Sequence, residues 1–413
     1  SQNSALTGLN CDNNQLTSLD LSNNPNLNWV SCSENNLTSL DVSQSSGLLD
    51  LFVVNNQLTT LNLDNNPNLT TLNLDYNQLT GLTLTNNTSL ASLFVQYNQL
   101  NALDVTQNAN LLSLYVESNN LTQLDLSQNI LLADLSCAHN QLTELIVTNN
   151  LDLVSLQCGS NDLVELNVDS NTQLEGLFCD DNLLGALNVT QNTKLRSLSF
   201  YHNSVESIDL DQNLLLEGIN TGDNLLEQLD VSNNTALRIL GASLNNLTEL
   251  NVSQNPALTV LDIFGNQLTH LDVRNGNNQN ITEFYASDND LSCVSVDDPS
   301  AGYIDNWNFD QFVIFSDDCG DSSILTQGNV TVFPNPFVTT MQVVHEDTNL
   351  DPLTMSIVVL NESGAQEPSV NSFLNATNDG LELDMSGLVV GTYYLQVYDP
   401  ATQGIETFRV WKE

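Results

Sequence analysis

A period of 21 residues runs through most of the chain and constrains its fold more than any other feature. Asparagine recurs at every twenty-first position from Asn14 to Asn266, and Asn289 follows after a small insertion. Each period has two similar halves, because residues 69–77 read LTTLNLDYN and residues 79–87 read LTGLTLTNN. One such coil cannot bury its leucines alone, whereas stacked coils share a continuous core. The sequence therefore predicts a solenoid.

The spacing within one coil predicts which side chains face inward. Leu72 and Leu74 alternate along a short strand, Asn77 turns the chain, and the next two leucines return to the interior. A buried turn leaves backbone groups that need hydrogen-bond partners, and an inward Asn side chain supplies them. The repeated Asn is therefore structural rather than catalytic.

Five of the seven cysteines occupy one inward position, three residues before the repeating Asn. They are Cys11, Cys32, Cys137, Cys158 and Cys179. Other coils place Val, Leu, Phe or Ala there, so we interpret these cysteines as small buried hydrophobic residues. A disulfide between neighbouring coils is left open, because the sequence does not fix the sulfur geometry.

The pattern L-x-x-L-x-L-x-x-N-x-L over residues 6–296 resembles the leucine-rich repeat family. The 21-residue length and the inward cysteines resemble internalin-J-type bacterial repeats, which implies a surface-exposed binding protein. We therefore expect a mostly β fold, with a leucine-rich repeat solenoid of about fourteen coils over residues 1–292 and a small antiparallel β-sandwich at the C-terminus.

Cys293 and Cys319 lie where the repeat has ended, and they flank an aromatic segment that contains Trp307. We interpret residues 293–322 as a cap over the last coil and predict that the two cysteines form a disulfide. Closing that loop would stabilise the fold by roughly 3 to 4 kcal/mol. Such a bond also indicates an oxidising compartment.

Short alternating runs separated by Gly, Asn and Pro turns predict an antiparallel β-sandwich over residues 323–413. Its motifs VFPNPF, LNESG, DMSGL and GTYYL resemble the C-terminal sorting domain of type IX secretion substrates of the Bacteroidota. The residues that carry this resemblance are Pro334, Asn335, Pro336, Gly364, Gly387, Gly391 and Tyr393. The resemblance implies recognition by the type IX secretion machinery, and a secreted or outer-membrane surface location.

The chain carries 6 Lys and Arg against 50 Asp and Glu, a formal net charge of −44. A nucleic-acid surface must be basic, so this balance excludes nucleic acid as a partner. No apolar run is long enough for a transmembrane helix, so we expect no direct membrane insertion. The N-terminal residues lack the basic and apolar regions of a signal peptide, as at a processed or trimmed end.

Outward-facing aromatic side chains gather on consecutive coils. Phe52, Phe94 and Tyr115 are each the fourth residue before the repeating Asn, and Tyr76 and Tyr97 directly precede it. Aromatic residues are only 6% of the chain, so five together favour a patch that binds protein or polysaccharide. The alternative is cross-strand pairing that only stabilises the sheet.

A second ligand patch is predicted at Phe178, Tyr201, His202 and Phe264. Asp181, His202 and Asp223 on neighbouring coils are weak candidates for a divalent-cation site, with solvated charge pairing as the stronger interpretation. In this register Ser160 lies two coils from His202, which is beyond hydrogen-bond reach and excludes a nucleophilic triad.

An acidic position in the second half of the repeat places like charges on neighbouring coils, as at Asp104 and Asp125 and at Asp209 and Asp230. Opposed like charges destabilise a ladder. Bound Ca²⁺ or salt would relieve them, and the alternative is that intervening Asn, Thr and solvent suffice. No other cofactor is expected.

The sequence holds no nucleotide-binding, zinc-protease or nucleophile-elbow motif. A glycosidase needs two carboxyls in a cleft, and none of the acidic positions offers a cleft. We therefore expect a secreted or cell-surface binding or adhesion protein rather than an enzyme, exported through its C-terminal domain. The alternative is a structural or accessory subunit of a surface complex at the outer membrane.

Overall fold

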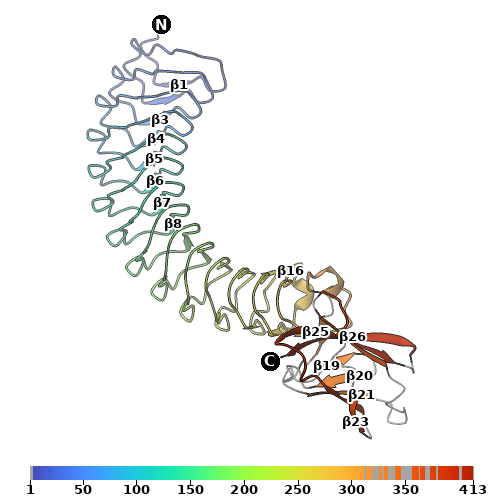
Figure 1. Cartoon of the computed structure of the whole chain (residues 1–413). Coiled ribbons are helices and arrows are strands. Elements are labelled where there is room, and N and C mark those ends of the chain that lie inside the picture. Colours follow the sequence, from blue (N-terminus) through green and yellow to red (C-terminus); the bar gives the residue numbers. More distant parts are fainter. Residues whose placement is uncertain are drawn as a thin grey trace. The chain divides into compact units, whose positions relative to one another are not determined.

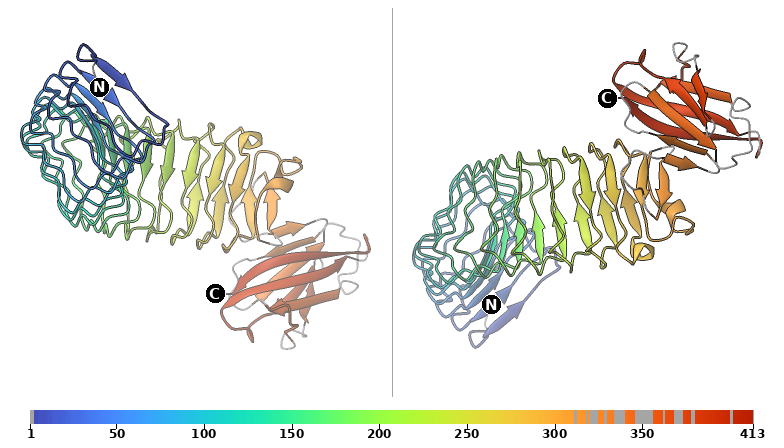
Figure 2. Two further views of the ribbon diagram at one scale, coloured as in Figure 1. Left: turned by 90° about the horizontal axis from the view of Figure 1, so that it is seen from above. Right: turned by 90° about the horizontal axis from the view of Figure 1, so that it is seen from below.

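The computed structural model describes residues 3–310, 313–317, 319, 325–327, 330–333, 340–345, 356–361, 363–367, 373–377, 380–399 and 402–412. The chain divides into two compact units. The first comprises Ser1–Leu226 with Asn233–Ala242, and the second comprises Glu227–Ser232 with Ser243–Glu413. Most of the chain is a β-solenoid of about 15 turns, and antiparallel sheets follow at the C-terminal end (Figures 1 and 2). The predicted fold class is confirmed.

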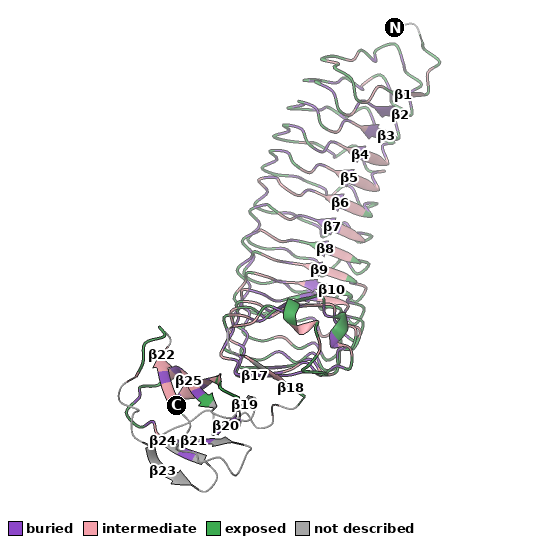
Figure 3. Cartoon of the chain, turned by 90° about the vertical axis from the view of Figure 1, so that its right-hand side faces the viewer, coloured by how far each residue is buried: buried purple, intermediate pink, exposed green. Residues whose placement is uncertain are grey.

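The first unit contains a parallel sheet to which each coil contributes one three-residue strand, and Figure 3 shows β2 to β10 along one edge of the coils. Each strand pairs with the strand one period later, as Leu114 does with Leu135. The strands are β1 (Gly8–Asn10), β2 (Trp29–Ser31), β3 (Asp50–Phe52), β4 (Thr71–Asn73), β5 (Ser92–Phe94), β6 (Ser113–Tyr115), β7 (Asp134–Ser136), β8 (Ser155–Gln157), β9 (Gly176–Phe178), β10 (Ser197–Ser199), β11 (Gly218–Asn220) and β12 (Ile239–Gly241).

Side-chain alternation explains these short strands. From β2 onward the middle residue is apolar and buried, as Leu93 and Leu114 are, while the residue before it keeps some exposure. Leucines from the second half of each coil, such as Leu100 and Leu121, are buried as well. Each coil therefore adds one layer to a common apolar core, at roughly 25 cal/mol for every Å² removed from water.

The repeating Asn forms a hydrogen-bonded ladder across the coils. Asn161 accepts a hydrogen bond from the Leu142 N–H at 2.9 Å and donates to the carbonyls of Cys137 and Cys158 at 3.0 and 3.1 Å. The side chain is buried, so these backbone groups depend on it for partners. Asn171, in the second half of the coil, donates in the same way to carbonyls of the preceding coil.

The cysteine position faces the core, as predicted. Cys32, Cys137, Cys158 and Cys179 are buried free thiols, and Cys11 is half-buried. Burial raises the pKa of the Cys32 and Cys137 thiols to about 12 and also raises the pKa of the other three. A thiol held neutral is a poor nucleophile and a poor metal ligand, which fits a packing role.

The solenoid part of the second unit has strands on two faces of the coil. β14 (Val260–Asp262) pairs in parallel with β16 (Glu283–Tyr285). A second parallel sheet consists of β13 (Glu249–Asn251), β15 (His270–Asp272), β17 (Cys293–Ser295) and β18 (Ile314–Ser316). The 3-10 helices η1 (Asn278–Asn280) and η2 (Ile304–Asn306) interrupt the coils. The strands β17 and β18 carry the stacked geometry past residue 292.

The predicted disulfide between Cys293 and Cys319 is confirmed. Trp307, between the two cysteines in the chain, is buried against Phe284, with ring centroids 4.9 Å apart in an edge-to-face arrangement. The Trp307 indole N–H donates to the carbonyl of Ile281 at 3.2 Å. The indole thus covers the apolar end of the coils while its polar group stays paired.

The C-terminal residues form two antiparallel sheets around a shared apolar core. One sheet has the order β19 (Leu325–Gln327), β20 (Val330–Phe333), β21 (Thr340–His345), β24 (Gly380–Asp384) and β23 (Phe373–Thr377). The other has β22 (Ser356–Asn361), β25 (Gly391–Asp399) and β26 (Gly404–Lys412). Leu395 and Phe408 lie in that core, which also packs against the disulfide.

Arg409 of β26 joins the C-terminal sheets to the last coils of the same unit. Its guanidinium donates to the carbonyls of Asn289 and Leu291 at 2.8 and 3.1 Å and pairs with Asp290 at 3.2 Å. The Arg409 side chain is only 12% exposed, so these bonds lie away from bulk solvent. No helix in the described part of the chain is long and apolar enough to cross a membrane.

We expect Asn161→Ala to lower the free energy of unfolding by about 2 to 4 kcal/mol, because several buried backbone groups lose their partner. Asn149→Ala, at an exposed Asn one coil earlier, is the matched control and should change it by less than about 0.5 kcal/mol. Urea unfolding followed by circular dichroism gives both values. Similar losses in the two variants would contradict a ladder of this strength.

Candidate functional site

The residue directly before the repeating Asn adopts a left-handed backbone conformation in each coil from Asn13 to Asp223, with φ between 50° and 56°. This conformation costs a non-glycine residue roughly 1 kcal/mol or more. The 21-residue period alone does not predict this conformation. Its signal is the use of Asn13, Asn55 and Gly265 at this position, because Asn and Gly adopt positive φ most readily.

The outward residues of β1–β12, together with the two residues before each repeating Asn, form a surface that we call the strand face. Four of the five predicted patch residues form two ring stacks on it. The rings of Tyr76 and Tyr97 lie 4.3 Å apart at 7°, and those of Phe94 and Tyr115 lie 5.0 Å apart at 18°. Tyr76 and Tyr97 are 50% and 42% exposed. The structure therefore brings these rings together at the surface.

Phe52 belongs to the same face but is placed differently. It ends β3 and pairs in register with Asn73 of β4, which separates it by one coil from Phe94. We call Tyr76, Phe94, Tyr97 and Tyr115 the aromatic patch, and Phe52 lies at its margin.

Glu117 is part of the patch and was missed by sequence reasoning. It accepts hydrogen bonds from the Tyr97 hydroxyl at 3.2 Å, from the Gln96 amide at 3.2 Å and from the Ser136 hydroxyl at 3.3 Å. The Glu117 charge raises the pKa of Tyr97. Three neighbouring coils are thus tied together by one carboxylate, which holds the Tyr97 ring in place.

Asp75, which precedes Tyr76 of the patch in the chain, is a buried carboxyl. It is 8% exposed and accepts a hydrogen bond from the Gln96 N–H at 2.7 Å. Burial raises its pKa to about 6, and the nearby Glu117 charge acts in the same direction. This carboxyl therefore changes its charge close to neutral pH, one residue before Tyr76 of the patch.

The second predicted patch is brought together only in part. Phe178, Tyr201 and His202 lie on neighbouring coils of the first unit, and the Tyr201 and His202 rings are 6.1 Å apart. Phe264 belongs to the second unit, where it is 38% exposed and its N–H donates to Asp262.

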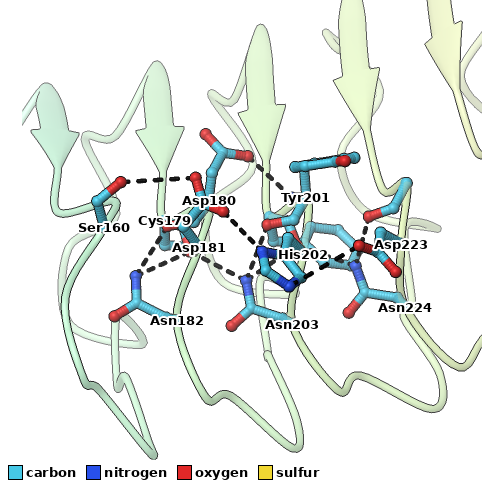
Figure 4. Close-up of polar contacts among 12 residues, drawn as sticks. Ser160, Cys179, Asp180, Asp181, Asn182, Tyr201, His202, Asn203, Asp223 and Asn224 are labelled. Atoms are coloured by element: carbon cyan, nitrogen blue, oxygen red, sulfur yellow. Dashed lines mark hydrogen bonds and ion pairs between the residues drawn. The ribbon is translucent and has the colours of Figure 1, made fainter.

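The candidate cation ligands form a charge-paired row. His202 Nδ1 lies 2.7 Å from Asp181, and its Nε2 lies 3.9 Å from Asp223, as Figure 4 shows. The hydrogen bond to Asp181 raises the pKa of His202. Among the residues that the structure describes, no group of three or more His, Cys, Asp or Glu is arranged to hold a metal ion. The Ser160 hydroxyl lies 3.5 Å from a carboxylate oxygen of Asp181, on the next coil. His202 lies one coil further along.

The acidic position of the second half-repeat has local hydrogen-bond donors. Asp104 accepts from the hydroxyl of Thr106 at 2.6 Å and from its N–H at 2.9 Å, and these bonds lower the pKa of Asp104. Asp125 gains the same support from Ser127, and its pKa is lowered although the Asp104 charge opposes this. The turns therefore stabilise these carboxylates themselves. Binding of Ca²⁺ at this position stays a prediction.

Of the described residues of the sorting motif, Gly391 and Tyr393 lie in β25, and Gly364 lies after the end of β22. Gly364 and Gly391 have φ of 77° and 152°, which favours glycine. The Tyr393 hydroxyl donates to the carbonyl of Val389 at 3.0 Å, and Gly387 lies in the turn between β24 and β25. Pro334, Asn335 and Pro336 lie outside the described residues.

One solved structure is similar to this chain over nearly its whole length. The functional domain of InlJ from Listeria monocytogenes, which includes a cysteine ladder, matches with a TM-score of 0.72 at 29% identity, over 99% of this chain and 86% of that chain. The chain is a leucine-rich repeat solenoid similar to the internalins. The column of inward cysteines in this chain is comparable to the cysteine ladder named for InlJ.

Two further structures agree. A leucine-rich repeat protein of Leptospira interrogans matches with a TM-score of 0.66 at 26% identity, over 74% of this chain and 84% of that chain. An internalin, InlF, from Listeria monocytogenes shares the fold, with a TM-score of 0.60 at 22% identity over 75% of this chain and 87% of that one. The sequence matches no protein-family model and no curated protein.

Asp75→Asn should change how stability depends on pH. A carboxyl whose folded pKa is raised favours the folded state only while it is protonated, so the wild type loses this contribution as pH rises through about 6. Relative to the variant, we expect the wild type to lose about 1 to 2 kcal/mol of unfolding free energy between pH 4.5 and pH 7.5. Urea unfolding at both pH values measures this. Parallel pH profiles would rule out a buried titrating Asp75.

Proposed function

We propose that this protein is a secreted or cell-surface binding protein, and that a protein ligand docks on its aromatic patch. The observation that supports this most directly is the pair of ring stacks, Tyr76 on Tyr97 and Phe94 on Tyr115, over three neighbouring coils. Clustered tyrosines are typical of binding hot spots, and repeat solenoids present extended surfaces to partners. The likeness to the internalin fold supports the same general role.

Energetics argue against a purely structural role for the two exposed tyrosines. A stacked pair contributes about 0.5 to 1.5 kcal/mol beyond its buried area. Tyr76 and Tyr97 both adopt the left-handed conformation, which costs each of them about 1 kcal/mol or more. The strain of the two residues together, about 2 kcal/mol or more, exceeds the contribution of the stack, so sheet stability alone does not account for tyrosine at two positions where Asn would be less strained.

The stacking geometry favours protein over polysaccharide as the ligand class. At 4.3 Å and 7°, the facing sides of Tyr76 and Tyr97 cover one another. Sugar rings stack on open aromatic faces, and stacking closes one face of each tyrosine while leaving its ring edge and hydroxyl group for a ligand. Edges and hydroxyls suit apolar side chains and backbone groups of a protein.

Residues 323–413 are proposed as the address for type IX secretion. The support is the sequence resemblance together with two antiparallel sheets in which Gly364 and Gly391 occupy positions that favour glycine. The oxidising compartment implied by the Cys293–Cys319 disulfide agrees with export.

The patch is tested with Tyr76→Asn combined with Tyr97→Asn. Asn already occupies this position at Asn13 and Asn55, so the variant should fold normally. We expect its affinity for a captured protein ligand to fall at least tenfold, as hot-spot truncations do. The measurement is biolayer interferometry of the immobilised full chain, against purified cell-surface proteins and against purified polysaccharides.

The matched control is Ile146→Thr combined with Val164→Thr. It removes two side chains that are 59% and 60% exposed outside the strand face, at positions where other coils carry Thr. Less than a twofold change is expected. Equal loss in both variants, or capture of polysaccharide alone, would contradict the proposal, and no capture would favour a structural subunit.

Export is tested by removing residues 323–413 in a bacterium that has type IX secretion. The full chain should reach the medium or the cell surface, because the address is present, and the truncated chain should stay inside the envelope. Immunoblots of the fractions give the distribution. A host without the secretion system is the control, and export of the truncated chain would refute the assignment.

A further inference from the structure

A hollow lies on the strand face next to the aromatic patch, between Glu117 and Phe178. Its volume is about 360 Å³, enough for one large side chain. Ala138 and Gly159 line it, at the same position in their coils where Tyr201 stands further along the chain. The hollow exists because two successive coils carry the smallest residues at this position.

Gly159 and Gly176 both help to keep the hollow open. A Cβ atom on Gly159 would lie 3.1 Å from the backbone oxygen of Asp180. The ring of Phe178 lies over Gly176 of the same strand, where a Cβ would be 3.1 Å from the ring. Gly159 therefore adds no side chain to the hollow, and Gly176 leaves space for the Phe178 ring.

The walls of the hollow carry negative charge. Three carboxylates line it, from Glu117, Asp180 and Asp181, and no Lys or Arg is among the described residues that line it. The Ser199 hydroxyl and the Tyr201 N–H hold Asp180, and His202 holds Asp181, so both carboxylates have fixed positions (Figure 4). Phe178 adds a partly exposed aromatic ring. Acidic walls around an aromatic ring suit a cation.

We propose that this hollow receives an arginine side chain of the protein that binds the strand face, an inference that rests on the proposed function. A guanidinium is planar, stacks on an aromatic ring and donates to carboxylates in two directions. Phe178 supplies the ring, and Glu117, Asp180 and Asp181 supply acceptors along the lining of the hollow. The aromatic patch then binds the apolar surface around that arginine.

Charge complementarity favours an arginine side chain over a neutral sugar or a second copy of this chain. The chain has a net charge of −44, so a basic surface is attracted over a distance and an acidic one is repelled. A neutral sugar would gain nothing from the net charge. A second copy of this chain would bring the same negative charge to the hollow.

The test uses acetyl-Gly-Arg-Gly-amide and its citrulline analogue, which has nearly the same shape but no charge. Saturation-transfer NMR on the full chain, at 150 mM NaCl, gives both dissociation constants. We expect the arginine peptide to bind at least tenfold more tightly than the citrulline peptide. Equal binding of the two peptides would overturn the proposal.

Two variants locate the site. Glu117→Gln combined with Asp181→Asn removes two charges from the hollow but keeps acceptor oxygens, and it should reduce arginine binding at least fivefold. Ala138→Tyr fills the hollow with the residue that Tyr201 places at the same position, and it should abolish binding. The control, Glu144→Gln combined with Asp152→Asn, removes two exposed charges elsewhere and should change binding less than twofold.

The outcomes separate this inference from the proposed function. Tyr76→Asn alone should leave binding of the arginine peptide within twofold of the wild type, because Tyr76 does not line the hollow and it is Tyr97 that donates to Glu117. Loss of arginine binding in the charge control as in the hollow variant would show attraction by net charge only and would refute the arginine site. In that case the protein ligand would still lose affinity in the double tyrosine variant, and the proposed function would stand.

Discussion

The hydrogen bonds of the repeating Asn are the constraint on which the rest of the structure depends. Asn161 bonds to backbone groups of its own coil and of the coil before it, and the equivalent bonds recur along the chain, as at Asn56 and Asn119. A shift of one residue in any coil would unpair a buried amide and expose leucines. The ladder therefore fixes the register, and the register alone decides which outward side chains become neighbours.

Fixed register explains why much of the architecture could be predicted from the sequence. A 21-residue spacing places Phe94 beside Tyr115 and Tyr76 beside Tyr97 without further information, and both pairs are stacked. The inward cysteines follow from the same alignment. These are properties of position in the repeat, whereas the Cys293–Cys319 bond was predicted from two cysteines that flank an aromatic segment after the repeat has ended.

Other features of the site depend on particular side chains, and they could not be predicted. The burial of Asp75 arises from the neighbours that cover it and not from its place in the repeat, since Asp180 occupies the same position with greater exposure. The hollow depends on where small residues, Ala138 and Gly159, fall between larger ones. The role of Glu117 arises from three hydrogen bonds to neighbouring coils. Periodicity averages over such differences, so it hides them.

The charge of the chain bears on what kind of adhesion the strand face can support. Cations are few, and Arg196 lies between Glu175 and Glu217 at 4.0 and 2.6 Å, where it relieves repulsion at the edge of the strands. The neighbouring patch and hollow instead keep carboxylates at Asp75, Glu117 and Asp181. Two copies meeting face to face would oppose these like charges and desolvate them, which is unfavourable. The proposed basic partner would instead pair with these carboxylates.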